Sequence, residues 1–247
     1  MRLYLIRHAQ SENNARWVRT RAPGGYVPDP LLTELGHKQA KTLAKFLKPN
    51  SRGGLGQKKD PFDRYGFHIT HLYCSLMQRA IQTGAYISQA LGLPLNGRED
   101  IHERGGLTGE DDKGGEPVGL PGPGRAFFTS HYPDLVLPDT VNDAGWWNRP
   151  YETREQANRR AGQLLDNLTT HHNNLDDRVA MVTHGGFINT LLKELLGATK
   201  PDYDSGDLTG FWFGAGNASI TKIEFESDLV LLVYHNRTDF MATKLIT

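Results

Sequence analysis

Short apolar runs alternate with longer amphipathic stretches along most of this chain. The runs at 3–6, 69–74 and 179–182 have the length of buried strands. Apolar residues recur three and four positions apart after Thr33, which predicts a helix that Thr33 caps and Pro49 ends. The same spacing predicts helices at about 79–91 and 154–168, and a third that follows Gly186, passes through Leu191 and Leu196 and stops at Gly197. Alternating strands and helices indicate an α/β fold, and we expect a three-layer α/β/α sandwich around a mostly parallel sheet.

Other parts of the chain lack this periodicity. The segments 15–32 and 50–66 are rich in Gly, Pro or polar residues and are predicted to be loops. Two apolar runs, 218–225 and 229–234, flank a polar turn and predict a β-hairpin. The segment at about 104–150 is long and irregular, so we expect an insert that forms a lid over a functional site. Its Trp146 and Trp147 are expected to pack rather than to bind a substrate.

Length and composition narrow the class of protein. A chain of 247 residues is near the upper size of a single hydrophobic core, so one domain over 1–247 is expected. With 28 basic and 28 acidic residues the formal net charge is zero, so we expect no nucleic-acid or membrane partner. The single cysteine, Cys74, allows neither an intramolecular disulfide nor a thiolate metal site. Without a signal peptide or a run long enough to span a membrane, a cytoplasmic location is expected.

Polar clusters follow three of the predicted strands. They are Arg7-His8, Ser75 to Arg79, and His184-Gly185-Gly186. Because functional groups collect at the carboxyl ends of parallel strands, we expect these clusters to meet. Two histidines and two arginines would then form a cationic pocket in a neutral chain. A phosphoryl group is the natural ligand of such a pocket, since arginine forks match its oxygens and a helix N-terminus adds N–H donors.

A histidine that attacks phosphorus must be neutral, with one ring nitrogen protonated and held so that the other is free. A backbone carbonyl near His8 could hold it. The leaving oxygen needs a proton, and Glu103 is the best-placed donor, because burial and nearby negative charge both raise the pKa of a carboxyl group. Considered without any further motif, these residues could also have roles other than catalysis. His8 and His184 could be structural histidines, and Glu103 could be a surface residue paired with Arg104.

The clusters resemble the motifs of the histidine phosphatase superfamily, which includes the cofactor-dependent phosphoglycerate mutases and fructose-2,6-bisphosphatase. The matching segments run in the family's order over nearly the whole chain. They are Arg7-His8-Ala9-Gln10-Ser11-Glu12-Asn13-Asn14, Pro30-Leu31-Leu32-Thr33-Glu34-Leu35-Gly36, Ser75-Leu76-Met77-Gln78-Arg79-Ala80-Ile81-Gln82-Thr83, Glu103 and Thr183-His184-Gly185-Gly186. The resemblance implies a phosphoglycerate mutase-like fold.

The resemblance also implies a role for each matched residue. His8 would be the nucleophile that forms a phosphohistidine, and Glu103 would protonate the leaving group and later activate water. His184 would contact the phosphoryl group and stabilise the transition state. Contacts to the phosphoryl oxygens are implied for four further positions, Arg7, Arg79, Asn14 and the backbone of Gly185. The family needs no metal or other cofactor, so none is expected here.

Departures from the family pattern separate the possible activities. Glycine usually follows the nucleophile, and here it is Ala9, which fits if its φ is negative. Mutases carry a His-Tyr pair after the Glu-Arg, whereas Glu103-Arg104 here runs directly into Gly105. This loss favours a phosphatase acting on a small phosphomonoester, such as a sugar phosphate. A phosphoglycerate mutase-type phosphotransferase and an inactive binding module remain as alternatives. A homodimer is the expected assembly if the chain associates, since dimers are the commonest oligomers.

Overall fold

The computed structural model describes residues 1–22, 25–48, 60–64, 66–110, 117–172, 174, 176–197, 211–227 and 229–247. Its centre is a seven-stranded sheet in the order β6-β3-β2-β7-β1-β8-β9. The strands are β1 (Arg2–Arg7), β2 (His71–Ser75), β3 (Leu95–Arg98), β6 (Leu135–Val136), β7 (Arg178–Thr183), β8 (Ile220–Glu226) and β9 (Leu229–Arg237). The first five in this spatial order run parallel, and β8 and β9 form the predicted antiparallel hairpin at one edge.

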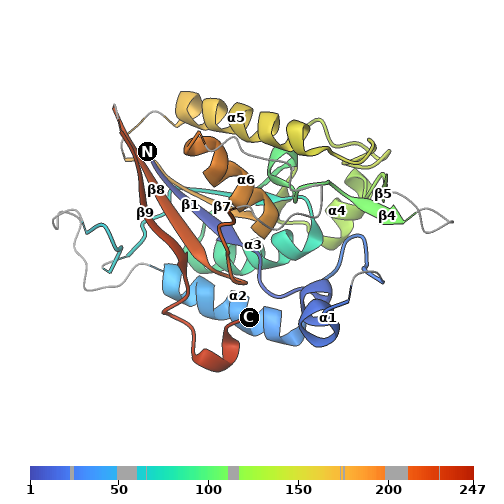
Figure 1. The fold of residues 1–247 in the computed structure, drawn as a ribbon, viewed down its shortest axis with the longest axis horizontal. Helices are drawn as coiled ribbons and strands as arrows, with labels where there is room; N and C mark the ends of the chain where they lie inside the picture. Colours follow the sequence, from blue (N-terminus) through green and yellow to red (C-terminus); the bar gives the residue numbers. More distant parts are fainter. Residues whose placement is uncertain are drawn as a thin grey trace.

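Helices cover both faces of the sheet (Figure 1). The helices α2 (Glu34–Leu47) and α3 (Gln78–Leu91) pack on one face, and α5 (Arg154–His171) and α6 (Gly185–Leu195) pack on the other. Side chains of β1 alternate between the two cores, with Tyr4 and Ile6 facing α2 and α3, and Leu3 and Leu5 facing α5 and α6. The three-layer sandwich with a mostly parallel sheet is therefore confirmed.

The prediction of a loop over 15–32 is wrong in its first part. The chain forms a helix, α1 (Glu12–Thr20), that extends into the segment 15–32, which was expected to be a loop. Ser11 caps it in a capping box with Asn14, so two otherwise unpaired N–H groups are satisfied. No residue of α1 is buried, so the helix has no apolar stripe in the sequence that would reveal it. By contrast, Thr33 caps α2 as expected, with its hydroxyl accepting from the Gly36 N–H at 3.0 Å.

The segment 104–150 has more structure than its irregular pattern indicates. The described part contains the short hairpin β4 (Thr108–Glu110) and β5 (Pro117–Gly119), the helix α4 (Arg125–His131) and the edge strand β6. Trp146 and Trp147 are 3% and 4% exposed, so both pack in the interior as expected. Two 3₁₀ turns, Glu99–Ile101 and Thr243–Leu245, complete the elements. Pro49 and most of the expected loop at 50–66 lie outside the described residues.

No helix in the described part of the chain is long and apolar enough to span a membrane.

A buried ion pair beside the β8–β9 hairpin yields a stability prediction. Asp63 accepts hydrogen bonds from the hydroxyls of Tyr4 and Tyr234 and from Lys222 Nζ, each at 3.0 Å. Lys222 is 1% exposed and also lies 3.0 Å from a Glu224 carboxylate oxygen. Asp63→Asn leaves this ammonium with one charged partner fewer, so we expect the free energy of unfolding to fall by about 3 kcal/mol in urea titrations.

The control is Asp239→Asn, which removes an exposed carboxylate paired with Arg237. A surface pair of this kind contributes less than about 1 kcal/mol, so this variant should unfold close to the parent. Equal destabilisation by the two variants would contradict the buried-pair argument.

Candidate active site

Three strand ends meet at the carboxyl edge of the sheet, as the polar clusters predicted. In the register, Arg7 at the end of β1 lies opposite Thr183 at the end of β7. On the other side of β7, Val182 lies opposite Cys74 of β2, one residue before Ser75. The chain leaves these three ends into loops or helix starts. The residues that follow each strand are therefore neighbours in space.

His8 is held with one ring nitrogen free. Its Nδ1 lies 2.7 Å from the Ala9 carbonyl oxygen, and a carbonyl can only accept, so Nδ1 carries the proton. Its Nε2 then has the lone pair, which accepts from Arg79 Nε at 3.2 Å. Burial, with the guanidinium charges of Arg79 and Arg7, lowers the pKa of His8 well below its usual value. The ring is thus neutral at pH 7 and presents Nε2 as a nucleophile.

Buried polar nitrogens without partners belong to the residues around the His8 ring. Arg7 Nε, Arg79 Nη1 and His184 Nδ1 are buried and have no hydrogen-bond partner among the described residues. The His8 and His184 ring centroids are 5.1 Å apart. His184 is fixed by a 2.9 Å hydrogen bond between its Nε2 and Ser75 Oγ, and Arg7 donates from Nη1 to the Ala215 carbonyl at 2.5 Å. Because buried donors need acceptors, the arrangement suits a tetrahedral oxyanion.

Glu103 reaches the same pocket from the start of the 104–150 segment. Its carboxylate accepts from the Gly186 N–H at 3.2 Å, near the start of α6, and from the Arg104 N–H at 2.8 Å. A Cβ on Gly186 would lie 2.4 Å from Glu103 Oε1, so only glycine allows this approach. The side chain is half-buried. Both of these hydrogen bonds come from backbone N–H groups.

A network behind Glu103 fixes its backbone. His102 is 1% exposed, and its Nδ1 lies 2.7 Å from the Glu103 carbonyl oxygen. Arg160 donates to the carbonyls of Asp100 and His102, at 2.8 and 3.3 Å, and forms a bidentate pair with Glu152. His102 thus lies behind Glu103, and its ring packs against a tryptophan rather than facing the pocket.

The structure brings the other two expected residues to the rim of the pocket. A Cβ on Gly185 would lie 3.3 Å from Arg7 Nε, so its backbone borders the arginine. Asn14 Oδ1 accepts from the N–H and hydroxyl of Ser11 and from Asn217 Nδ2 at 3.0 Å. Asn217 Nδ2 also donates to the His8 carbonyl at 3.1 Å, so Asn14 supports the backbone of His8.

Sequence reasoning missed several supporting residues. Asn217 precedes the β8–β9 hairpin and belongs to no motif, and Asp29, 3.8 Å from Arg79 Nη1, lay in the segment expected to be a loop. No sequence signal marked either residue. The substitution at Ala9 is harmless, because this residue does not have a left-handed φ.

Three buried histidines make stability depend on pH. Burial lowers the pKa of His8, His102 and His184 well below the usual value of about 6.5. Below pH 6.5 the unfolded chain therefore binds more protons than the folded one, so the free energy of unfolding falls with pH. Each histidine adds up to about 1.4 kcal/mol per pH unit to this slope. Urea titrations between pH 7.5 and 5.5 measure it, and His102→Gln should flatten it; an unchanged slope would contradict the burial of a neutral His102.

The family comparison agrees with this geometry. The family model described as the histidine phosphatase superfamily (branch 1) matches residues 3–113 and 128–238. The chain belongs to this superfamily. It is an enzyme of the phosphoric monoester hydrolase class.

Relatives matched over most of their length are phosphatases by name. A protein of Hydrogenobacter thermophilus named "Putative phosphoserine phosphatase 2" is 29% identical over 96% of this chain and 95% of its own. Adenosylcobalamin/alpha-ribazole phosphatase of Salmonella typhimurium is 24% identical over 79% of this chain and 80% of its own. A phosphoserine phosphatase mutant of Entamoeba histolytica, solved with phosphoserine, has a TM-score of 0.57 at 19% identity, covering 98% and 99% of the two chains. This last likeness concerns the fold.

Proposed function

We propose that the protein hydrolyses a small phosphomonoester through a phosphohistidine at His8, without a metal in the reaction. The observation that carries this is the neutral His8 ring, whose Nε2 carries the lone pair, with three unpaired buried donors near it. Such donors match the oxygens of a phosphoryl group as it becomes trigonal in the transition state.

In the first step, His8 Nε2 attacks phosphorus and the bond from phosphorus to the leaving oxygen breaks. Arg79 Nε must first release Nε2, and a phosphoryl oxygen then replaces it as the acceptor. Arg7 and His184 bind the other oxygens. Glu103, held by the Gly186 and Arg104 N–H groups, supplies the proton to the leaving oxygen.

In the second step, water attacks the phosphohistidine. Glu103 takes a proton from this water, the bond from nitrogen to phosphorus breaks, and inorganic phosphate leaves with His8 restored. The 104–150 segment, which begins next to Glu103, covers the site in this proposal. A lid of this kind would exclude bulk water during the first step.

A substrate with a second anionic group suits the rim best. Arg104 adjoins the proposed acid, and its guanidinium lies 5.6 Å from the centre of the Trp212 ring, which Lys193 also approaches at 6.0 Å. The Arg104 guanidinium beside the proposed acid favours a carboxylate-bearing phosphomonoester, for which phosphoserine and 3-phosphoglycerate are suitable probes.

The test compares phosphate release from phosphoserine, phosphoethanolamine, 3-phosphoglycerate and an aryl phosphate, each with and without a chelator. We expect release from all four, unaffected by the chelator, with a higher kcat/KM for phosphoserine than for phosphoethanolamine, which lacks the carboxylate. Activity lost to the chelator would overturn the metal-free mechanism. Isomerisation of 3-phosphoglycerate without phosphate release would instead support the mutase alternative.

A further inference from the structure

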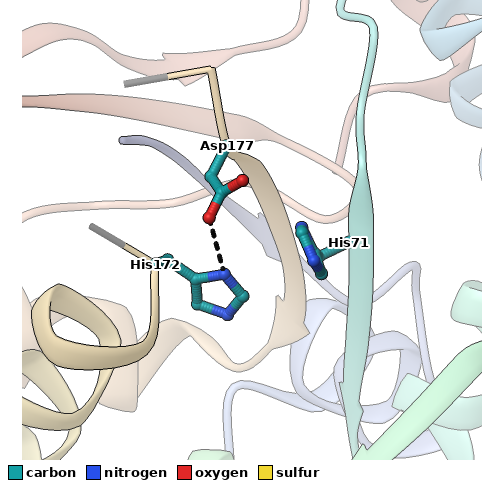
Figure 2. A group of neighbouring side chains, drawn as sticks. All are labelled: His71, His172 and Asp177. Atoms are coloured by element: carbon teal, nitrogen blue, oxygen red, sulfur yellow. Dashed lines mark hydrogen bonds and ion pairs between the residues drawn. The ribbon is translucent and has the colours of Figure 1, made fainter. Parts of the chain in front are cut away.

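Two histidines and an aspartate meet at the opposite edge of the sheet from the catalytic pocket. His71 begins β2, His172 follows the last turn of α5, and Asp177 directly precedes β7. One nitrogen or oxygen from each lies within 4.8 Å of the other two. In Figure 2 the three side chains point into one space between the strand and the end of the helix. None of them belongs to a motif used above.

We propose that His71, His172 and Asp177 bind a zinc ion that ties the end of α5 to the starts of β2 and β7. Imidazole and carboxylate are ligands that Zn²⁺ accepts, and three protein ligands leave the fourth tetrahedral position to water. The proposal concerns a structural ion and is independent of the phosphatase mechanism.

The spacing of the closest pair fits zinc. His172 Nδ1 lies 3.2 Å from Asp177 Oδ2. Bonds of about 2.0 to 2.1 Å in a tetrahedron place two ligand atoms about 3.3 Å apart. An ion can therefore replace the proton shared by this pair without moving either side chain far. His71 completes the set by a small rotation, which its half-buried position at the start of a strand permits.

In each histidine, the ring nitrogen that would not bind the ion lies within hydrogen-bond distance of a neighbouring hydroxyl group. The Tyr73 hydroxyl lies 3.2 Å from His172 Nε2, and Thr70 Oγ1 lies 2.8 Å from His71 Nδ1. If these nitrogens donate their N–H, then His172 Nδ1 and His71 Nε2 are free to bind an ion. The Thr70 hydroxyl keeps an acceptor for its own proton in the Arg178 carbonyl at 3.3 Å. Outer partners of this kind orient histidine ligands in known metal sites.

The surrounding charges allow a divalent ion. One cation in this region is Arg98, whose guanidinium lies over the Tyr73 ring at 5.4 Å and forms a bidentate pair with Asp100. The Met1 ammonium is a second cation, and its charge interacts with the Asp177 carboxylate.

The site is too far from His8 to take part in the reaction. The whole of β7 separates Asp177 from His184, and a strand of six residues is about 20 Å long. Zinc should therefore change stability and leave turnover as it is.

Equilibrium dialysis of the full-length protein against Zn²⁺, followed by metal analysis, tests the proposal. We expect one equivalent of zinc, a higher unfolding temperature with zinc, and a tetrahedral visible spectrum with Co²⁺. His172→Gln, His71→Asn and Asp177→Asn should each weaken zinc binding at least tenfold. Matched controls are the adjacent exposed residues in His171→Gln and Asp176→Asn, which should bind zinc like the parent.

Two further measurements separate this site from the catalytic one. His8→Ala should still bind the ion, and His71→Asn should keep the parent kcat on an aryl phosphate. Zinc binding that is lost in His8→Ala but kept in His172→Gln would place the ion in the catalytic pocket and overturn the proposal. Absence of zinc binding by the folded parent protein would overturn it as well, without bearing on phosphatase activity.

Discussion

Replacing His8 with alanine is expected to abolish phosphate release, with a loss in kcat on the order of 10⁵-fold. The reason is that His8 Nε2 is the lone-pair nitrogen that the arginine donors of this pocket face. His184 Nδ1 is unpaired, but its position beside the arginine donors suits binding of the group rather than attack on it. The assay is steady-state phosphate release from an aryl phosphate, with the folded state checked by circular dichroism.

The variant also tests the covalent step. Acid-sensitive, base-stable label from a ³²P-substrate should appear on the parent protein and be absent from His8→Ala. Inorganic phosphate should still bind the variant, because Arg7, Arg79 and His184 remain. The control is His131→Ala, an exposed histidine on α4, which should retain full activity. A His8→Ala enzyme within tenfold of the parent would refute His8 as the nucleophile.

Glu103→Gln should slow turnover by about 10²- to 10⁴-fold for substrates with poor leaving groups, such as phosphoserine. Glutamine has the same length but cannot donate a carboxylic acid proton to the leaving oxygen. For an aryl phosphate with a good leaving group the loss should be small, because little protonation is needed. The measurement is kcat/KM across a series of phosphomonoesters, plotted against the pKa of the leaving alcohol. The variant should show the steeper dependence.

A structural effect of the same substitution must be distinguished. The carboxylate accepts from two N–H groups, and glutamine keeps one acceptor oxygen, so one contact to Gly186 or Arg104 is lost. Loss of that contact alone would slow all substrates equally. Equal slowing across the series would therefore contradict Glu103 as the acid. Glu155→Gln, on the exposed first turn of α5, is the control for loss of a carboxylate elsewhere.

Much of the fold was predictable because buried apolar residues recur at regular spacings along helices and strands. Strands such as β1 and β7 lie in the interior, and their apolar runs are visible in the sequence. The carboxyl ends of parallel strands must lie at one edge, so Arg7-His8 and His184 could be expected to meet. Helix α1 could not be predicted in this way, because it buries nothing and depends on the Ser11–Asn14 capping box.

Details of the pocket depended on contacts between distant segments. The sequence indicated Glu103 as a candidate acid, but only the fold brings it to the Gly186 N–H. Likewise, Asn217 contacts both His8 and Asn14 from the other end of the chain. Neither contact has a local pattern, because the partners are joined by the folding of the sheet rather than by spacing.

The sequence by itself determined the layered α/β fold, the strand ends that bear the site and the identity of the candidate nucleophile. The resemblance to the family also led to the expectation of no metal, and no motif in the sequence marked His71, His172 and Asp177. Only the tertiary structure brought these three side chains together, and only it decided which nitrogen of His8 is free. The physical reason is that hydrophobic periodicity is local to each element, whereas hydrogen bonds and ligand sets form between elements that packing brings into contact.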